Sequence, residues 1–237
     1  MNRRVFILII IATIGITIAG FLNMDHFSDN PESGSNRSAT NRLKIFNPSD
    51  INPLLVDESI QKINKDHQID SFSFQNQLGD TITNTSVKGK IFVTDFFFTT
   101  CGGICPKMTN QLSRLQSEFI DDSNFLILSH TVNPSIDTVE TLFKYANRFN
   151  ANPEKWWFLT GTKKDLYTMA RKSYLVVPDE SDPNFEHGGE SDFLHTENFA
   201  LIDPKGRIRG MYDGTEPSEI DELIRDVYDL KKEFKLD

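Results

Sequence analysis

A long apolar segment that runs straight into a helical pattern is the feature that most constrains the fold of this chain. Residues 91–100 are rich in β-branched and aromatic side chains, and they predict a buried strand. The helical pattern behind them consists of four apolar residues at spacings of 4, 3 and 4: Met108, Leu112, Leu115 and Phe119. A strand followed at once by a helix is typical of α/β folds, whose functional residues commonly lie on such connections.

The same alternation continues along the chain. Residues 67–74 and 80–83 predict a hairpin around a turn at Gly79. Further strands are expected at residues 124–132 and 156–159, each followed by a helical pattern, and a last strand pair and helix close the chain. Alternating strands and helices predict a largely parallel central sheet. The expected fold is therefore α/β, a thioredoxin-like domain with an N-terminal β-hairpin extension.

The N-terminal part differs in composition from the rest of the chain. Residues 5–22 carry no charge, and as a helix they would span about 27 Å, which is close to the hydrocarbon thickness of a membrane. Arg3 and Arg4 precede them, so the positive-inside rule places the following chain outside the cytoplasm. We expect a membrane anchor at 1–23, a flexible linker at 24–44 and the folded domain at 45–237; a cleaved signal peptide is the alternative.

This topology and the acidic composition restrict the environment of the domain. A single-pass protein of the inner membrane would carry its domain on the extracytoplasmic, periplasmic side, where thiols can form disulfides. The formal net charge of −9 argues against nucleic acid as a partner.

The two cysteines of the chain, Cys101 and Cys105, lie between the predicted strand and the predicted helix. Two thiolates can bind one soft metal ion such as Cu(I) or Zn²⁺, and they can also form a disulfide. The first turn of a helix lowers the pKa of a thiol, which makes the reactive thiolate accessible. A structural disulfide remains the alternative, although it would close a very short loop and restrict the unfolded chain little.

Two thiolates rarely complete a metal site, so a third ligand is sought among the histidines. Any one of them, taken alone, is more often a surface or core-edge residue than a ligand. The chain has five: His26, His67, His130, His187 and His195.

Four motifs in a fixed order resemble the Sco (SenC) family of membrane-anchored, thioredoxin-like copper proteins. They are Cys101-Gly-Gly-Ile-Cys-Pro106, the segment from Ser129 to Thr138, the Trp-containing segment from Trp156 to Gly161, and His195 before Leu201-Ile-Asp-Pro-Lys-Gly206. The resemblance runs from about Ile69 to the C-terminal helix. Two departures are the Gly102-Gly103 pair between the cysteines and Asn133 in place of an aspartate.

By this resemblance, Cys101, Cys105 and His195 would bind Cu(I) and Cu(II). Asp137 falls where the family keeps an aspartate near the copper site, and it would support the ligands; a helix cap is the alternative role. The implied function is a copper chaperone, not an enzyme, that delivers copper to the binuclear copper centre of cytochrome c oxidase during assembly. Its partners would be the oxidase subunit that carries that centre, other copper chaperones and thiol reductants.

Two alternative functions stay open at this point. The same thiols could belong to a thiol–disulfide oxidoreductase that acts on exported or oxidase cysteines, with Cys101 and Cys105 as the redox pair. Three residues between the cysteines speak against a standard thioredoxin, which has two. A copper or redox sensor is the other alternative, and it would have to signal through a partner protein.

Overall fold

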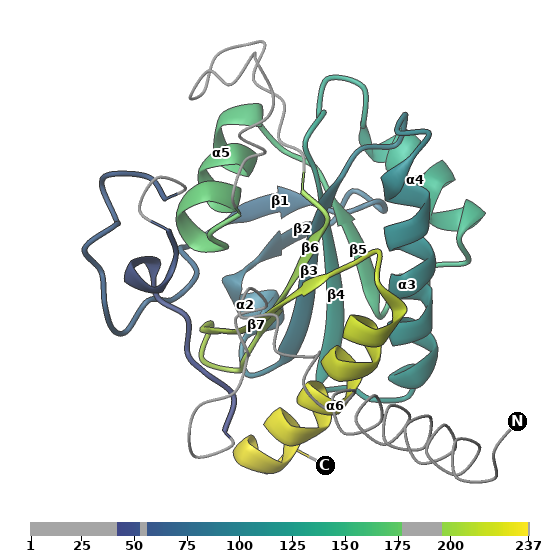
Figure 1. Ribbon diagram of the computed structural model, residues 1–237. Helices are drawn as coiled ribbons and strands as arrows, with labels where there is room; N and C mark the ends of the chain where they lie inside the picture. Colours follow the sequence, from purple (N-terminus) through teal and green to yellow (C-terminus); the bar gives the residue numbers. More distant parts are fainter. Residues whose placement is uncertain (1–41, 53–55, 177–195, 237) are drawn as a thin grey trace, which may run out of the picture. The chain divides into compact units, whose positions relative to one another are not determined.

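The structure is a computed structural model that describes residues 42–52, 56–176 and 196–236 (Figure 1). The predicted anchor, most of the predicted linker, His26, His187 and His195 lie outside the described residues. Within the described ranges no helix is long and apolar enough to cross a membrane.

Five strands form the main sheet in the order β5, β4, β3, β6, β7. Their bounds are Trp156–Leu159, Phe125–Thr131, Ile91–Phe97, Asn198–Ile202 and Ile208–Asp213. The strands β3, β4 and β5 run parallel, and β6 and β7 join the other edge in antiparallel directions. The predicted parallel centre of the sheet is thereby confirmed, and the last strand pair adds antiparallel strands at one edge.

Helices cover the sheet on both sides. The helices α3 (Ile104–Glu118), α4 (Val139–Arg148) and α6 (Pro217–Phe234) contribute to the hydrophobic cluster on one face of β3. The other face packs against α5 (Lys163–Thr168) and its continuation as a π-helical turn (Met169–Ser173), and also against β1, β2 and the short α2 (Asn84–Val87). Figure 1 shows α3 and α4 opposite α5 and the β1–β2 pair.

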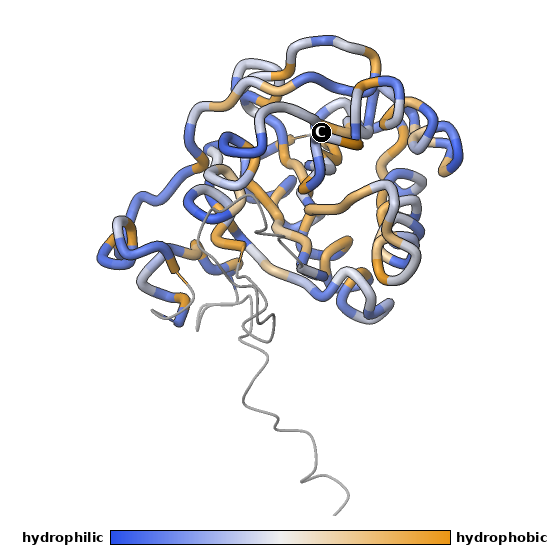
Figure 2. The backbone as a smooth tube through the Cα atoms, turned by 90° about the horizontal axis from the view of Figure 1, so that it is seen from above, coloured by the Kyte–Doolittle hydropathy of each residue, from blue (hydrophilic) through white to orange (hydrophobic). Residues whose placement is uncertain are grey.

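All seven residues of β3 and of β4 are buried, because each of these strands is covered on both faces. Consecutive side chains of a strand point to opposite faces, so Val93 joins the cluster under α3 and Phe92 joins the one beneath α5. In Figure 2 the inner part of the trace is accordingly mostly hydrophobic, whereas hydrophilic segments gather on the outside. Continuous burial explains why these segments read as unbroken apolar runs in the sequence.

The predicted hairpin is present as β1 (Ser73–Gln75) and β2 (Thr81–Thr83), which pair in antiparallel register. Gly79 turns it with a φ of 85°, a left-handed conformation that glycine adopts without steric cost. Gln77 in the same turn uses its side-chain amide to bond both the Trp156 carbonyl, at 2.8 Å, and the Phe158 N–H, at 2.9 Å. The hairpin thus satisfies polar groups on the outer edge of β5.

His130 is the polar exception at the centre of the sheet, and it is fully buried between aromatic rings. The Thr94 hydroxyl donates to the Leu128 carbonyl at 2.9 Å, so it accepts from His130 Nδ1, also at 2.9 Å. Burial lowers the pKa of His130 to about 3, which keeps the imidazole neutral. The histidine is therefore a fully buried core residue, whereas the sequence led us to expect a surface or core-edge position.

The buried His130 should make the stability of the domain depend on pH. Its pKa is about 3 when folded and about 6.5 when unfolded, so between these values only the unfolded chain takes up the proton. The free energy of unfolding should therefore fall as the pH drops from about 6.5 towards 3. We expect His130→Phe to lose this contribution, measured by urea unfolding at several pH values. Parallel pH profiles for the two proteins would contradict the prediction.

Candidate functional site

The two thiols lie where β3 ends and α3 begins. Cys101 is in the connecting loop, and its N–H donates to the Phe98 carbonyl at 3.2 Å to form a turn. Helix α3 starts at Ile104, so Cys105 is its second residue and Cys101 stands just outside it. Cys101 is half-buried, Cys105 is only 3% exposed, and both are free thiols. The pair is thus one accessible sulfur beside one hidden sulfur.

Cys101 acts as a cap for the start of α3. The N-cap residue is Gly103, which has no side chain to accept a hydrogen bond from the first turn. The Cys105 N–H instead donates to Cys101 Sγ at 3.4 Å. The unpaired N–H groups and the dipole of a helix start favour negative charge at this place. The loop therefore presents a sulfur in a position that stabilises its thiolate.

The two thiols differ strongly in acidity. Burial works to raise the pKa of Cys101, but hydrogen bonds from the Cys105 thiol and from three nearby amides outweigh it, so this pKa lies below the ordinary value. Burial raises the pKa of Cys105 to about 12, and the adjacent Cys101 sulfur and the Asp95 charge act in the same direction. Cys101 is consequently both the more acidic and the more accessible thiol of the pair.

Asp95 is a buried acid that the sequence reading did not single out. It lies in the middle of β3, is 1% exposed, and its Oδ1 has no hydrogen-bond partner. Burial raises its pKa to about 7, while a hydrogen bond with Ser129 partly offsets that effect. Ser129 also accepts from the Trp156 indole at 2.8 Å. The signal that could have found Asp95 is an acidic residue inside an otherwise apolar strand.

Asp137 is fully buried and holds the segment that leads to Cys101. Its carboxylate accepts hydrogen bonds from the Thr99 N–H at 3.2 Å, from the Thr99 hydroxyl, and from the Thr131 hydroxyl at 2.5 Å. The cap of α4 is the neighbouring Thr138, whose hydroxyl accepts from the Thr141 N–H at 3.3 Å. The carboxylate therefore ties the end of β4 to the thiol loop, two residues before Cys101.

Two histidines are described, and neither joins the thiols. His130 is in the core, and His67 is also buried, with Nε2 at 2.9 Å from the Ser173 carbonyl. The described chain resumes at Thr196, directly after position 195, and enters β6 at Asn198. Since β6 runs antiparallel to β3, with Thr94 opposite Ala200, this entry lies at the end of the sheet where the thiol loop follows β3. His195 itself, the residue before this entry, lies outside the described residues.

The donor set at this end of the sheet suits a soft metal ion. Thiolates favour Cu(I) and similar ions, and an imidazole would add a borderline ligand. Among the described residues no three histidine, cysteine or acidic side chains gather into a metal-binding group. The cysteine pair therefore needs a ligand from elsewhere to complete a site. Met108 does not supply it, because its side chain is fully buried in the core, as its helical spacing predicted.

Open space surrounds both glycines of the thiol loop. Gly102 and Gly103 are exposed, neither has a positive φ, and a Cβ atom at either position would meet no heavy atom within 4 Å. Packing therefore does not require glycine at these positions, although the Gly103 backbone, with a φ of −114° and a ψ of −96°, lies outside the helical and extended regions.

Comparisons with known proteins agree with this architecture. The sequence model of the SCO1/SenC family matches residues 60–231. An SCO1 protein homolog of Bacillus subtilis is 31% identical over 163 residues, which cover 68% of this chain and 81% of the relative. A protein of Stutzerimonas stutzeri that is named for copper binding is 24% identical over 163 residues, covering 68% and 76% of the two chains.

A solved structure shows the same fold. It is that of BsSco, which is described as having a disulfide switch and as belonging to the Sco family of cytochrome c oxidase assembly proteins. It superimposes with a TM-score of 0.59 at 29% identity, and the match covers 70% of this chain and 94% of that one. The predicted thioredoxin-like architecture of the family is thereby confirmed.

Removal of the Asp95 charge should make Cys105 more acidic. The Asp95 carboxylate disfavours a second negative charge on the buried sulfur, so Asp95→Asn is expected to lower the pKa of Cys105. Thiolate absorbance against pH, in a Cys101→Ser background, measures this shift. Asp121→Asn, an exposed change, should leave the titration as it is. An unchanged titration of Asp95→Asn would show that the acid does not act on the thiols.

Loss of the Asp137 carboxylate should destabilise the domain and loosen the thiol loop. Asp137→Ala leaves the Thr99 amide and two hydroxyls without their charged acceptor, at a cost of about 2–4 kcal/mol in the free energy of unfolding. Thr138→Ala, which removes only the adjacent helix cap, should cost about 1 kcal/mol. Urea unfolding measures both. Equal losses in the two variants would contradict the special role of Asp137.

Proposed function

Because the chain belongs to the SCO1/SenC family, we propose that it is a copper chaperone that holds copper through Cys101, Cys105 and His195. The observation that carries the proposal is the asymmetric thiol pair between β3 and α3, at the end of the sheet where β6 begins. The name of the Stutzerimonas relative supports copper as the metal. The chain makes or breaks no substrate bond in this role, so it is not an enzyme.

The geometry of the thiols suits transfer of a metal ion between proteins. Cys101 is half-buried and reachable from solvent, whereas Cys105 is shielded and fixed by the first turn of α3. A partner's ligands can therefore displace the accessible sulfur first while Cys105 still holds the ion. Asp137 takes the supporting role in this proposal, because it positions the loop through Thr99 and does not touch the metal.

The recipient we propose is the subunit of cytochrome c oxidase that carries the binuclear copper centre. The description of BsSco, as a member of a family of oxidase assembly proteins, supports this recipient. The proposal includes the membrane anchor at 1–23, the linker at 24–44 and an extracytoplasmic domain at 45–237, all of which rest on the sequence pattern. An anchored chaperone would share the membrane surface with an oxidase.

Thiol–disulfide exchange is the second candidate function. The disulfide switch described for BsSco favours it, and so does the close approach of the Cys105 N–H to Cys101 Sγ at 3.4 Å, which places the two cysteines side by side. A low pKa on the accessible sulfur and a high pKa on the buried one also suit exchange through a mixed disulfide. Both functions need accessible and interconvertible thiols.

Copper titration of the reduced domain tests the first proposal. We expect one copper per chain, with thiolate-to-copper charge-transfer bands for Cu(II), and an affinity at least about 100-fold lower in Cys101→Ser and His195→Ala. Met108→Leu is the matched control, because it removes a buried sulfur that faces the core. Unchanged affinity in His195→Ala would remove that residue from the site.

The same preparation separates the two functions. Failure to bind stoichiometric copper, together with a readily reversible Cys101–Cys105 disulfide, would assign the chain to thiol–disulfide exchange. His195→Ala should leave the thiol–disulfide equilibrium nearly unchanged while it abolishes tight copper binding. A variant that alters both equally would show that the histidine supports the loop and is not a ligand.

A further inference from the structure

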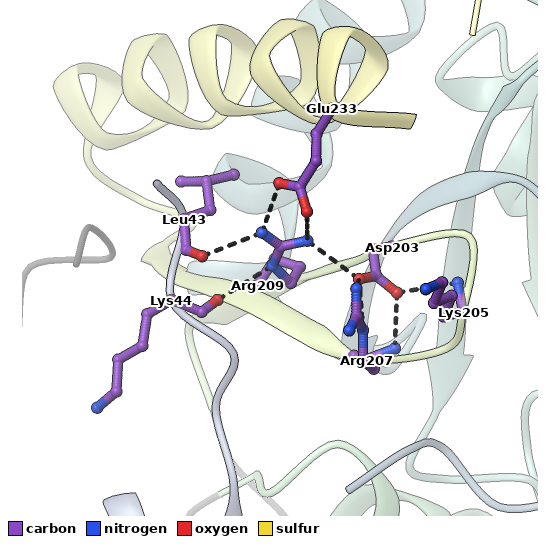
Figure 3. Close-up of polar contacts among 7 residues, drawn as sticks. All are labelled: Leu43, Lys44, Asp203, Lys205, Arg207, Arg209 and Glu233. Carbon is purple, nitrogen blue, oxygen red and sulfur yellow. Dashed lines mark hydrogen bonds and ion pairs between the residues drawn. The ribbon is translucent and has the colours of Figure 1, made fainter. Parts of the chain in front are cut away.

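Arg209 is a cation buried at the edge of the sheet, on β7, with only 2% of its surface exposed. All five of its N–H groups have acceptors (Figure 3). Nε donates to the Lys44 carbonyl at 3.2 Å and Nη2 to the Leu43 carbonyl at 3.0 Å. Nη1 donates to Asp203 at 3.1 Å, and both Nη groups bond the Glu233 carboxylate, at 3.2 and 2.8 Å. We call this group the Arg209 clamp.

The clamp holds a segment that is far away in sequence, residues 43–51, which we call the N-terminal strap. Leu43 and Phe46 of the strap are buried, and the Phe46 N–H donates to the Ile208 carbonyl at 2.9 Å. Asn47 accepts from the His67 N–H at 3.3 Å, and the Ser49 N–H donates to the Ile63 carbonyl at 3.0 Å. The strap therefore lies against β7, which is an edge strand of the main sheet.

The clamp and the thiols are at opposite ends of the sheet. Asp203 directly follows the last residue of β6 and Ile208 is the first residue of β7, so both lie where β3 begins, as the pairing of Phe92 with Ile202 requires. Cys101 follows the other end of β3. Since β3 has seven residues, the two ends are about 20 Å apart.

The strap is an addition to the part of the chain that resembles the family. The SCO1/SenC match covers residues 60–231. The strap lies before that range and Glu233 lies after it, so the clamp joins two segments outside the match to Asp203 and Arg209 inside it. Of the five hydrogen bonds that Arg209 donates, only the one to Asp203 stays within the matched range. The other four bind segments outside that range.

We propose that the Arg209 clamp moors the N-terminal strap so that the chain enters the domain at the end remote from the thiols. Whatever is attached through residues before 43 is then joined to that end, and the thiol end stays free to meet a partner. The consequence for a membrane-bound chain rests on the proposed anchored function. The attachment of the strap to the domain does not depend on that proposal. Without the clamp we expect the strap to lose its hold on β7, so that the chain would enter the domain nearer to residue 56.

Hydrogen exchange of the metal-free full-length chain tests the mooring. We expect Arg209→Gln and Glu233→Gln to accelerate exchange of strap amides, including that of Phe46, at least tenfold, while amides of β3 and β4 keep their protection. Glu222→Gln, on the same helix but outside the clamp, should change neither. Glu233→Gln decides the question if Arg209→Gln does not fold. Unchanged strap exchange in the folded clamp variants would overturn the proposal.

A fluorescence measurement tests the consequence for the thiols. The Cys105→Ser chain carries a dye on Cys101 and is reconstituted into phosphatidylcholine vesicles that contain a quencher on the lipid headgroup. We expect weak quenching with an intact clamp and clearly stronger quenching in Glu233→Gln. Equal quenching would overturn the spacing role. A chain that does not associate with vesicles would contradict the proposed anchor, whereas the exchange result would still decide the mooring.

Discussion

Burial of β3 on both faces is the constraint on which the other features of the domain depend. A strand at the centre of the sheet needs α3, α4 and α6 on one side and α5 with the β1–β2 hairpin on the other. Because both faces of β3 are covered, loops that reach solvent can follow or precede it only at its two ends. One end carries the thiol loop and the other faces the Arg209 clamp. The fold thus places the thiol loop and the Arg209 clamp at opposite ends of the sheet.

The asymmetry of the thiols follows from the same geometry. The first turn of α3 packs against the sheet and carries Cys105 into the core, near the buried Asp95. Cys101 stays in the loop, where amide N–H groups of the helix start face its sulfur. One connection therefore gives an accessible thiol with a lowered pKa and a shielded thiol with a raised pKa. Both metal transfer and disulfide exchange need that combination, so the local structure alone does not choose between them.

Local patterns in the sequence predicted the elements of the fold well. Hydrophobic runs located the strands, spacings of 3 and 4 located the helices, and a glycine located the hairpin turn, because these signals report burial and backbone freedom directly. The position of the cysteine pair could be predicted because the strand before it and the helix after it were both recognisable from their hydrophobic patterns. Asp95 was missed because a single acid in an apolar run does not reveal which face of the strand it occupies.

The sequence by itself determined the order of strands and helices, the position of the thiol pair between them and the core role of Met108. Only the tertiary structure decided which residues act on the pair and its loop: Asp137 bonds Thr99 and Thr131 while Thr138 caps α4, and the buried Asp95 raises the pKa of Cys105. The Arg209 clamp was likewise invisible, because its partners are up to 166 positions apart. Periodicity records which side of an element is buried, but contacts between distant elements exist only once the chain has packed.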